Sequence, residues 1–70
     1  MQIHSATELG SLIRNRREAL AIKQGDLASI AGVDQGNLSK IERGTAKATL
    51  DTYLRLCSAL GIDVLAELRA

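Results

Sequence analysis

The residues best suited to chemistry form a short polar run in the middle of the sequence. They are two amides, a glycine, a hydroxyl and an ammonium group: Gln35, Gly36, Asn37, Ser39 and Lys40. Side-chain amides can make paired hydrogen bonds to the N6 and N7 atoms of adenine, and a lysine ammonium can donate to the O6 and N7 atoms of guanine. Leu38 and Ile41 are left to hold the same segment onto an apolar core. The run is therefore able to read base edges, provided that it stands clear of the protein interior.

Two short helices around a glycine turn are predicted to position this run. The apolar residues between positions 24 and 31 indicate a helix of about two turns, which Gly32 ends by adopting a left-handed backbone. Asp34 is a good N-cap for the next helix, and Gly44 ends it. Ala28 is small enough to let the two helices cross closely. In a helix-turn-helix arrangement the second helix inserts its N-terminal part in the major groove, so the base-reading residues must lie in its first two turns.

Two further helices are expected on either side. Ser5 begins a capping-box pattern that starts a helix running to about Leu20. Thr49 caps a helix that Gly61 ends and whose apolar side carries Leu50, Tyr53, Leu54, Cys57 and Leu60. Beyond it, apolar and polar residues alternate, which favours a strand and leaves a short fifth helix open. The predicted fold class is all-α, with four to five short helices around a central helix-turn-helix and a C-terminal β-strand.

Length and composition predict one domain over residues 1–70. The chain has 70 residues, 46% of them hydrophobic, with one tyrosine and no phenylalanine or tryptophan. The core must therefore be aliphatic, and a lone core of this size is thin. Domains of this length often gain burial by pairing with a second chain, so a homodimer is expected.

Several functional classes are disfavoured. A lone Cys57 and a lone His4 supply neither an intrachain disulfide nor a metal site. No apolar run approaches the roughly 20 residues of a membrane span, so a cytoplasmic protein is expected. The sequence shows no catalytic triad, carboxylate pair or phosphate-binding glycine loop, so we expect neither an enzyme nor a cofactor. The formal net charge is only +1, but its distribution suggests a basic face. Two clusters of basic residues could form this face: Arg14, Arg16 and Arg17, and Lys40, Arg43 and Lys47. The alternative is that each cluster is ordinary solvated helix surface.

Taken together, these residues resemble the lambda-repressor-like, or Xre-type, helix-turn-helix family over nearly the whole chain. The resemblance is carried by Leu9, Ile13, Arg17, the stretch 24–28, Gly32-Val33, Leu38-Ser39, Ile41-Glu42, Gly44 and the stretch 54–61. Within the family, residues 60–65 are most similar to HipB-type antitoxins.

The resemblance implies roles for residues outside the polar run. Gln24 would brace DNA at the start of its helix, with an ordinary surface role as the alternative, and Arg17 would pair with Glu42 to lock the first helix to the recognition helix. Lys23 stands where the family has a threonine or serine cap, so that helix should lack a capping bond and Lys23 can instead approach a phosphate. The residues expected to meet phosphates after the recognition helix are Arg43, Thr45 and Lys47.

HipB-type resemblance further implies that residues 61–70 form a strand paired with its twofold mate. The candidate interface residues are Tyr53, Ile62, Val64, Leu65 and Leu68, with the chain's own core as the alternative for Tyr53. The resulting hypothesis is a bacterial, nucleoid-associated repressor that binds a double-stranded DNA operator as a homodimer. It would be the antitoxin of an operon that it represses and would bind a HipA-like kinase toxin. The alternatives are a free-standing phage-type repressor and a protein-interaction module that does not bind DNA.

Overall fold

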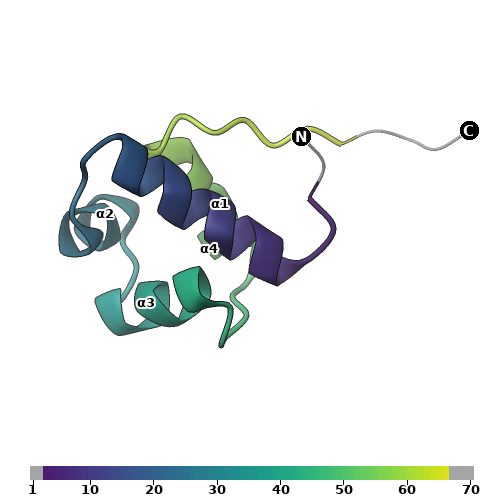
Figure 1. Cartoon of the computed structure of the whole chain (residues 1–70), viewed down its shortest axis with the longest axis horizontal. Helices are drawn as coiled ribbons and strands as arrows, with labels where there is room; N and C mark the ends of the chain where they lie inside the picture. The colour runs from purple at the N-terminus through teal and green to yellow at the C-terminus, as the bar shows by residue number, and fades with distance from the viewer. Residues whose placement is uncertain (1–2, 67–70) are drawn as a thin grey trace, which may run out of the picture.

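The computed structural model describes residues 3–66, in which four helices surround one core. They are α1 (Ala6–Ala19), α2 (Gln24–Ala31), α3 (Gln35–Arg43) and α4 (Leu50–Ala59). In Figure 1, α2 and α3 follow each other through a tight turn and α1 lies across them, with α4 behind. The predicted all-α class with a central helix-turn-helix is confirmed. Within residues 3–66, no helix is long and apolar enough to cross a membrane.

Three of the four helices begin at the capping side chain that the sequence predicts. Each accepts a hydrogen bond from the backbone N–H three residues further on: Ser5 from Glu8 at 3.1 Å, Asp34 from Asn37 at 3.0 Å and Thr49 from Thr52 at 3.2 Å. The exception is α2, whose N-cap Lys23 makes no side-chain capping bond, as expected. Gly32 (φ +68°) and Gly44 (φ +73°) end α2 and α3 in the left-handed region that favours glycine. These caps and stops fix the length of the recognition helix.

The core draws side chains from all four helices. It consists of Ile13, Leu27, Ala28, Ala31, Leu38, Ile41, Tyr53, Leu56, Cys57 and Leu60. Burial raises the pKa of the Cys57 thiol, which keeps it neutral and unreactive. The predicted inner side of α4 was partly wrong: Leu56 is buried, whereas Leu50 is 69% exposed and Leu54 is 42% exposed. At about 100° per residue, the latter two lie about 70° and 110° from the centre of the buried stripe.

A close contact that the sequence analysis did not anticipate sets the crossing of α1 over α3. Gly10 is buried in α1, and a Cβ atom added there would collide with the backbone carbonyl oxygen of Ile41 and lie 3.1 Å from the carbonyl carbon. Only a residue without a side chain lets the two helix backbones approach this closely.

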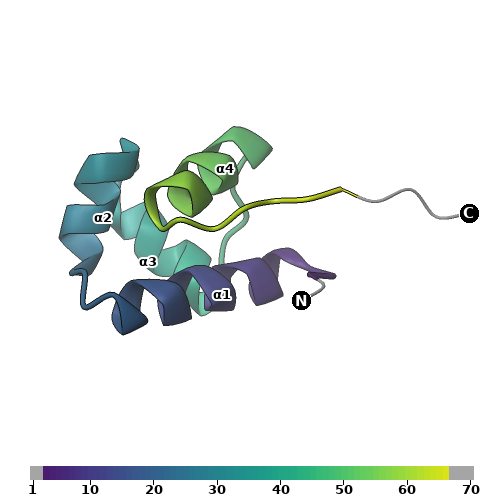
Figure 2. The same ribbon diagram turned by 90° about the horizontal axis from the view of Figure 1, so that it is seen from above.

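After α4 the chain runs out beside α1 and α4 (Figure 2). Residues 62–66 form neither a helix nor a strand in the described chain, so the fifth-helix alternative is not found there. Pairing of this segment with a second chain stays a prediction, and Leu68 lies outside the described residues. Tyr53 is buried in the core of its own chain, and its hydroxyl oxygen accepts a hydrogen bond from the backbone N–H of Ala48 at 3.4 Å. Its assignment to a dimer interface is therefore corrected.

Candidate nucleic-acid interface

The polar run stands clear of the protein interior. Gln35, Gly36, Asn37 and Lys40 are exposed and Ser39 is half-buried, whereas Leu38 and Ile41 of the same helix are buried in the core. Asp34 caps the helix from outside, so the first turn of α3 is both fixed and accessible. An exposed polar helix of this kind can enter a groove as a rigid unit.

The predicted base-reading residues do not all lie on one line of α3. At about 100° per residue, the side opposite the core is centred on Gly36, Lys40 and Arg43, which we call the outer stripe. Gln35 and Asn37 lie on opposite flanks of this stripe. The side-chain oxygen of Gln35 leans over the start of α2, 3.2 Å from where a Cβ atom on Gly25 would stand. The five residues are therefore spread over most of the exposed surface of the helix.

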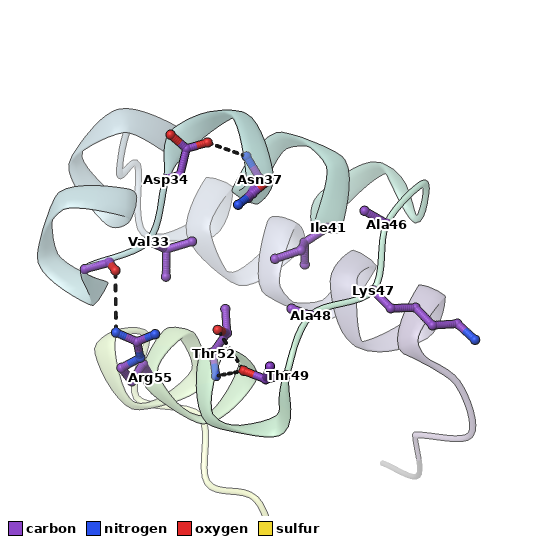
Figure 3. Close-up of a pocket in the computed structure, with 11 residues that line it drawn as sticks. Val33, Asp34, Asn37, Ile41, Ala46, Lys47, Ala48, Thr49, Thr52 and Arg55 are labelled. Atoms are coloured by element: carbon purple, nitrogen blue, oxygen red, sulfur yellow. Dashed lines mark hydrogen bonds between the residues drawn. The ribbon is translucent and has the colours of Figure 1, made fainter.

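Asn37 points into a hollow of about 400 Å³ between α3 and α4 (Figure 3). Val33, Ile41 and Ala48 line it together with polar residues from the α4 start. Asn37 lies on the α4 side of the helix, about 60° around the axis from Lys40, and its role as a base reader stays a prediction. Lys47 also borders the hollow, but its side chain extends away from it.

A buried ionic network ties the recognition helix to α1 and α2. Arg17 donates from Nε to Glu42 at 2.8 Å and from a terminal nitrogen to the other carboxylate oxygen at 3.0 Å. The Glu42 side chain is 1% exposed and that of Arg17 is 13% exposed. This hydrogen bonding raises the pKa of Arg17 above its ordinary value. A further donor of Arg17 reaches the carbonyl oxygen of Ile22 at 2.9 Å. The expected Arg17–Glu42 pair is present and locks three elements together.

Gln24 belongs to the same network, which sequence reasoning missed. Its side-chain nitrogen donates to Glu42 at 3.1 Å, whereas a DNA contact or an ordinary surface role was expected. The two residues are 18 positions apart, so only the fold brings them together. The carboxamide at the start of α2 is thus held in place before any ligand arrives.

The N-terminal basic cluster is used within the chain. Arg16 donates from Nε to the carbonyl oxygen of Leu60 at 3.0 Å and so ties α1 to the end of α4. Arg14 forms a surface ion pair with Glu18 at 3.5 Å. Because Arg17 is paired as well, all three arginines of this cluster make contacts within the chain. The exposed cations beside the polar run are those of α2, α3 and the following loop: Lys23, Lys40, Arg43 and Lys47.

A short helix, a glycine turn and an exposed second helix locked by a buried ion pair define the helix-turn-helix class. A sequence model described as "Helix-turn-helix domain" matches residues 8–70, and the chain belongs to this family.

Relatives and solved structures agree with this assignment. The chain is 38% identical over 55 residues, 79% of its length, to a Thermoplasma volcanium protein whose name assigns it provisionally to the HTH-type transcriptional regulatory proteins. It is 35% identical over 54 residues, 77% of its length, to an uncharacterized HTH-type transcriptional regulator of Mycobacterium tuberculosis. The matches cover 17% and 39% of these relatives, so the chain spans less than half of either.

Among solved structures, the chain is similar to the restriction-modification controller protein C.AhdI from Aeromonas hydrophila. The TM-score is 0.77 at 31% identity, over 83% of this chain and 88% of that one. HipB in a complex with an O2 20mer gives a TM-score of 0.82 at 24% identity, over 99% of this chain and 97% of that one. The second likeness concerns the fold alone.

Proposed function

We propose that this chain is a sequence-specific DNA-binding transcriptional repressor that inserts the start of α3 in the major groove. The observation that carries the proposal is the exposure of the polar residues of α3 above a buried apolar side. The family, and the transcriptional regulators among the relatives, support the same conclusion.

The side chains divide into two groups by what they can contact. Base edges are read from α3 by Gln35 and Lys40, with contributions from Gly36, Asn37 and Ser39. Phosphates are met from the start of α2 and from the loop after α3 by Lys23, Gln24, Thr45 and Lys47. The Thr45 hydroxyl donates to the carbonyl oxygen of Lys40 at 3.3 Å and must release this bond to donate to a phosphate. Phosphate contacts add affinity and salt dependence, whereas the base contacts supply the sequence preference.

Lys40→Ala is the variant that tests base reading. We expect it to lower discrimination at one base pair by about 1–3 kcal/mol, because a donor to guanine is lost, and Gln35→Ala should act similarly at another position. The measurement is a gel-shift titration of a duplex selected by the wild-type chain and of its single-base variants, repeated at several salt concentrations. Lys23→Ala is the matched control, since losing a phosphate contact weakens binding to all sequences alike.

Two outcomes would contradict this assignment. If Lys40→Ala weakened binding equally for every duplex, Lys40 would be a phosphate contact. If wild-type binding were insensitive to salt, the protein-interaction alternative would replace DNA binding, because phosphate neutralisation makes affinity fall steeply with salt.

A homodimer is the proposed assembly. Val64 is 56% exposed and Leu65 is 85% exposed on an extended segment, which makes them candidates for burial by a second copy. Ile62 packs partly against the chain's own core and so anchors this segment. We expect sedimentation equilibrium to show a dimer, and Leu65→Asp to weaken its association. On the operator, the two half-sites protected by the dimer should be centred about 34 Å apart. A monomeric wild-type chain that protects one isolated half-site would overturn the dimer.

The finer proposal is an antitoxin role with a HipA-like kinase toxin. It is supported by the resemblance of residues 60–65 to HipB-type antitoxins and by a similar structure described as a HipA-HipB-O2-O3 complex. C.AhdI, which has the higher identity, is instead a restriction-modification controller. Co-purification of a kinase-sized protein from the native cell would favour the antitoxin, and its absence a free-standing repressor.

A further inference from the structure

Arg43 lies on the side of α3 that faces away from the core. As the last residue of the helix it was assigned to the phosphate backbone together with the following loop. In the structure it lies on the outer stripe, within about 20° of Gly36 and 60° of Lys40 around the helix axis. It therefore faces the same way as the residues that approach the groove most closely.

A hydrogen bond directs the Arg43 side chain along this stripe. Its Nε donates to the carbonyl oxygen of Ser39 at 3.3 Å, one turn back toward the start of the helix. Long side chains on helices point toward the N-terminus in this way. The guanidinium is thus folded back along the helix, and within residues 3–66 its two terminal amino groups have no hydrogen-bond partner. Both terminal amino groups are therefore available to an acceptor outside the described chain.

Gly36 lets α3 approach the DNA closely, because the outer stripe carries no side chain in the first turn of the helix. A bare helix surface can approach the base edges more closely than one covered by a side chain. Arg43 follows Gly36 by seven residues, about 10 Å along the helix axis, which is about three base-pair steps. Arg43 itself lies beyond the first two turns of α3, but its side chain is folded back by one turn, which brings its donors over the part of the helix to which base reading was assigned.

We propose that Arg43 determines sequence specificity by donating both terminal amino groups to the O6 and N7 atoms of a guanine. The inference rests on the proposed DNA-binding function and replaces the assignment of Arg43 to a phosphate. An arginine fork matches the two guanine acceptors in one plane, whereas a phosphate contact carries no sequence information.

The test is selection from a random duplex library by four proteins: the wild-type chain, Arg43→Ala, Arg43→Lys and Lys47→Ala. We expect Arg43→Ala to lose one guanine preference in each half-site, by about 5- to 150-fold, and to keep the others. Arg43→Lys retains the charge but not the fork, so it should keep its salt dependence and still lose most of that preference. Lys47→Ala should retain the complete motif with uniformly lower affinity. Thermal melting of each variant establishes that it is folded.

A second measurement changes the DNA, so its main result comes from the wild-type chain. Replacing that guanine by 7-deazaguanine in the selected duplex removes the N7 acceptor. We expect several-fold weaker binding of the wild-type chain and no change for Arg43→Ala. If Arg43→Ala retains the complete motif and the salt slope becomes shallower by about one, Arg43 contacts a phosphate and the inference is wrong. If the wild-type chain enriches no motif, the proposed function itself fails and this inference with it. If the wild-type chain enriches a motif and all three variants enrich the same motif, only the role of Arg43 is refuted.

Discussion

Gly10→Ala lowers the free energy of unfolding by about 3 kcal/mol, since one methyl group is forced between two helix backbones. The added Cβ atom would meet the carbonyl group of Ile41 and stand 3.7 Å from the Cα atom of Glu42. Backbone atoms cannot turn away as a flexible side chain can, so α1 and α3 must separate. Alanine favours a helix over glycine by about 1 kcal/mol, and this gain is smaller than the cost of the collision. Urea titration monitored by circular dichroism measures the difference.

Gly36→Ala is the matched control for this prediction. It makes the same change inside a helix, but at an exposed position where the nearest outside atom is a carboxylate oxygen of Asp34 at 3.0 Å. Because this side chain can shift slightly, the helix preference of alanine offsets the contact, and we expect a change within about 1 kcal/mol. Equal losses from the two substitutions would show that helix crossing at Gly10 is not as tight as described.

Local patterns predicted most of the helix boundaries for a physical reason. Caps and left-handed glycines act within about four residues, so Asp34 and Gly44 identify the recognition helix without knowledge of the fold. The exposure of the polar run followed from the same local information, because burial of Leu38 and Ile41 leaves only one way for the helix to face.

Contacts between distant segments were not predictable in this way. Gly10 reads as an unremarkable glycine until α1 is laid over Ile41, 31 residues later in the chain. Arg16 looked like part of a basic face, but its partner is a backbone carbonyl, which every residue has and no sequence pattern marks. The Arg17–Glu42 pair was predicted from the family resemblance, because residue spacing alone does not indicate it. The sequence therefore predicts the residues that α3 exposes, but not the contacts through which the other helices hold α3 in place.

The largest loss expected from a polar substitution is at Glu42. Glu42→Ala leaves Arg17 with a charge that is largely buried and removes the acceptor of the Gln24 side-chain amide. Removing one member of a buried ion pair costs about 3–5 kcal/mol. A chain of 70 residues has a total stability of roughly 4–10 kcal/mol, so this loss is a large fraction of the total and the variant should unfold at a markedly lower temperature. Urea and thermal unfolding measure the loss.

Glu18→Ala provides the control for a general effect of losing a glutamate. Glu18 also pairs with an arginine, but both side chains are about half exposed, 53% for Glu18 and 52% for Arg14. Water screens such a pair, and we expect a change of no more than about 0.5 kcal/mol. Similar losses from Glu18→Ala and Glu42→Ala would contradict the importance of burial.

The double variant Arg17→Met/Glu42→Leu separates the ion pair from the shape of the interface. Removing both charges leaves no uncompensated ion, so the double variant should be more stable than either single variant. If the stability loss of the double variant equalled the sum of the losses of the two single variants, the two residues would not act as a pair. The double variant also frees Gln24 from its partner without exposing a buried charge. If the pair serves only to hold the helices together, the operator affinity of the folded molecules is retained. If the pair also orients Gln24 toward a phosphate, the affinity falls equally for all DNA sequences, and the base preferences of α3 persist.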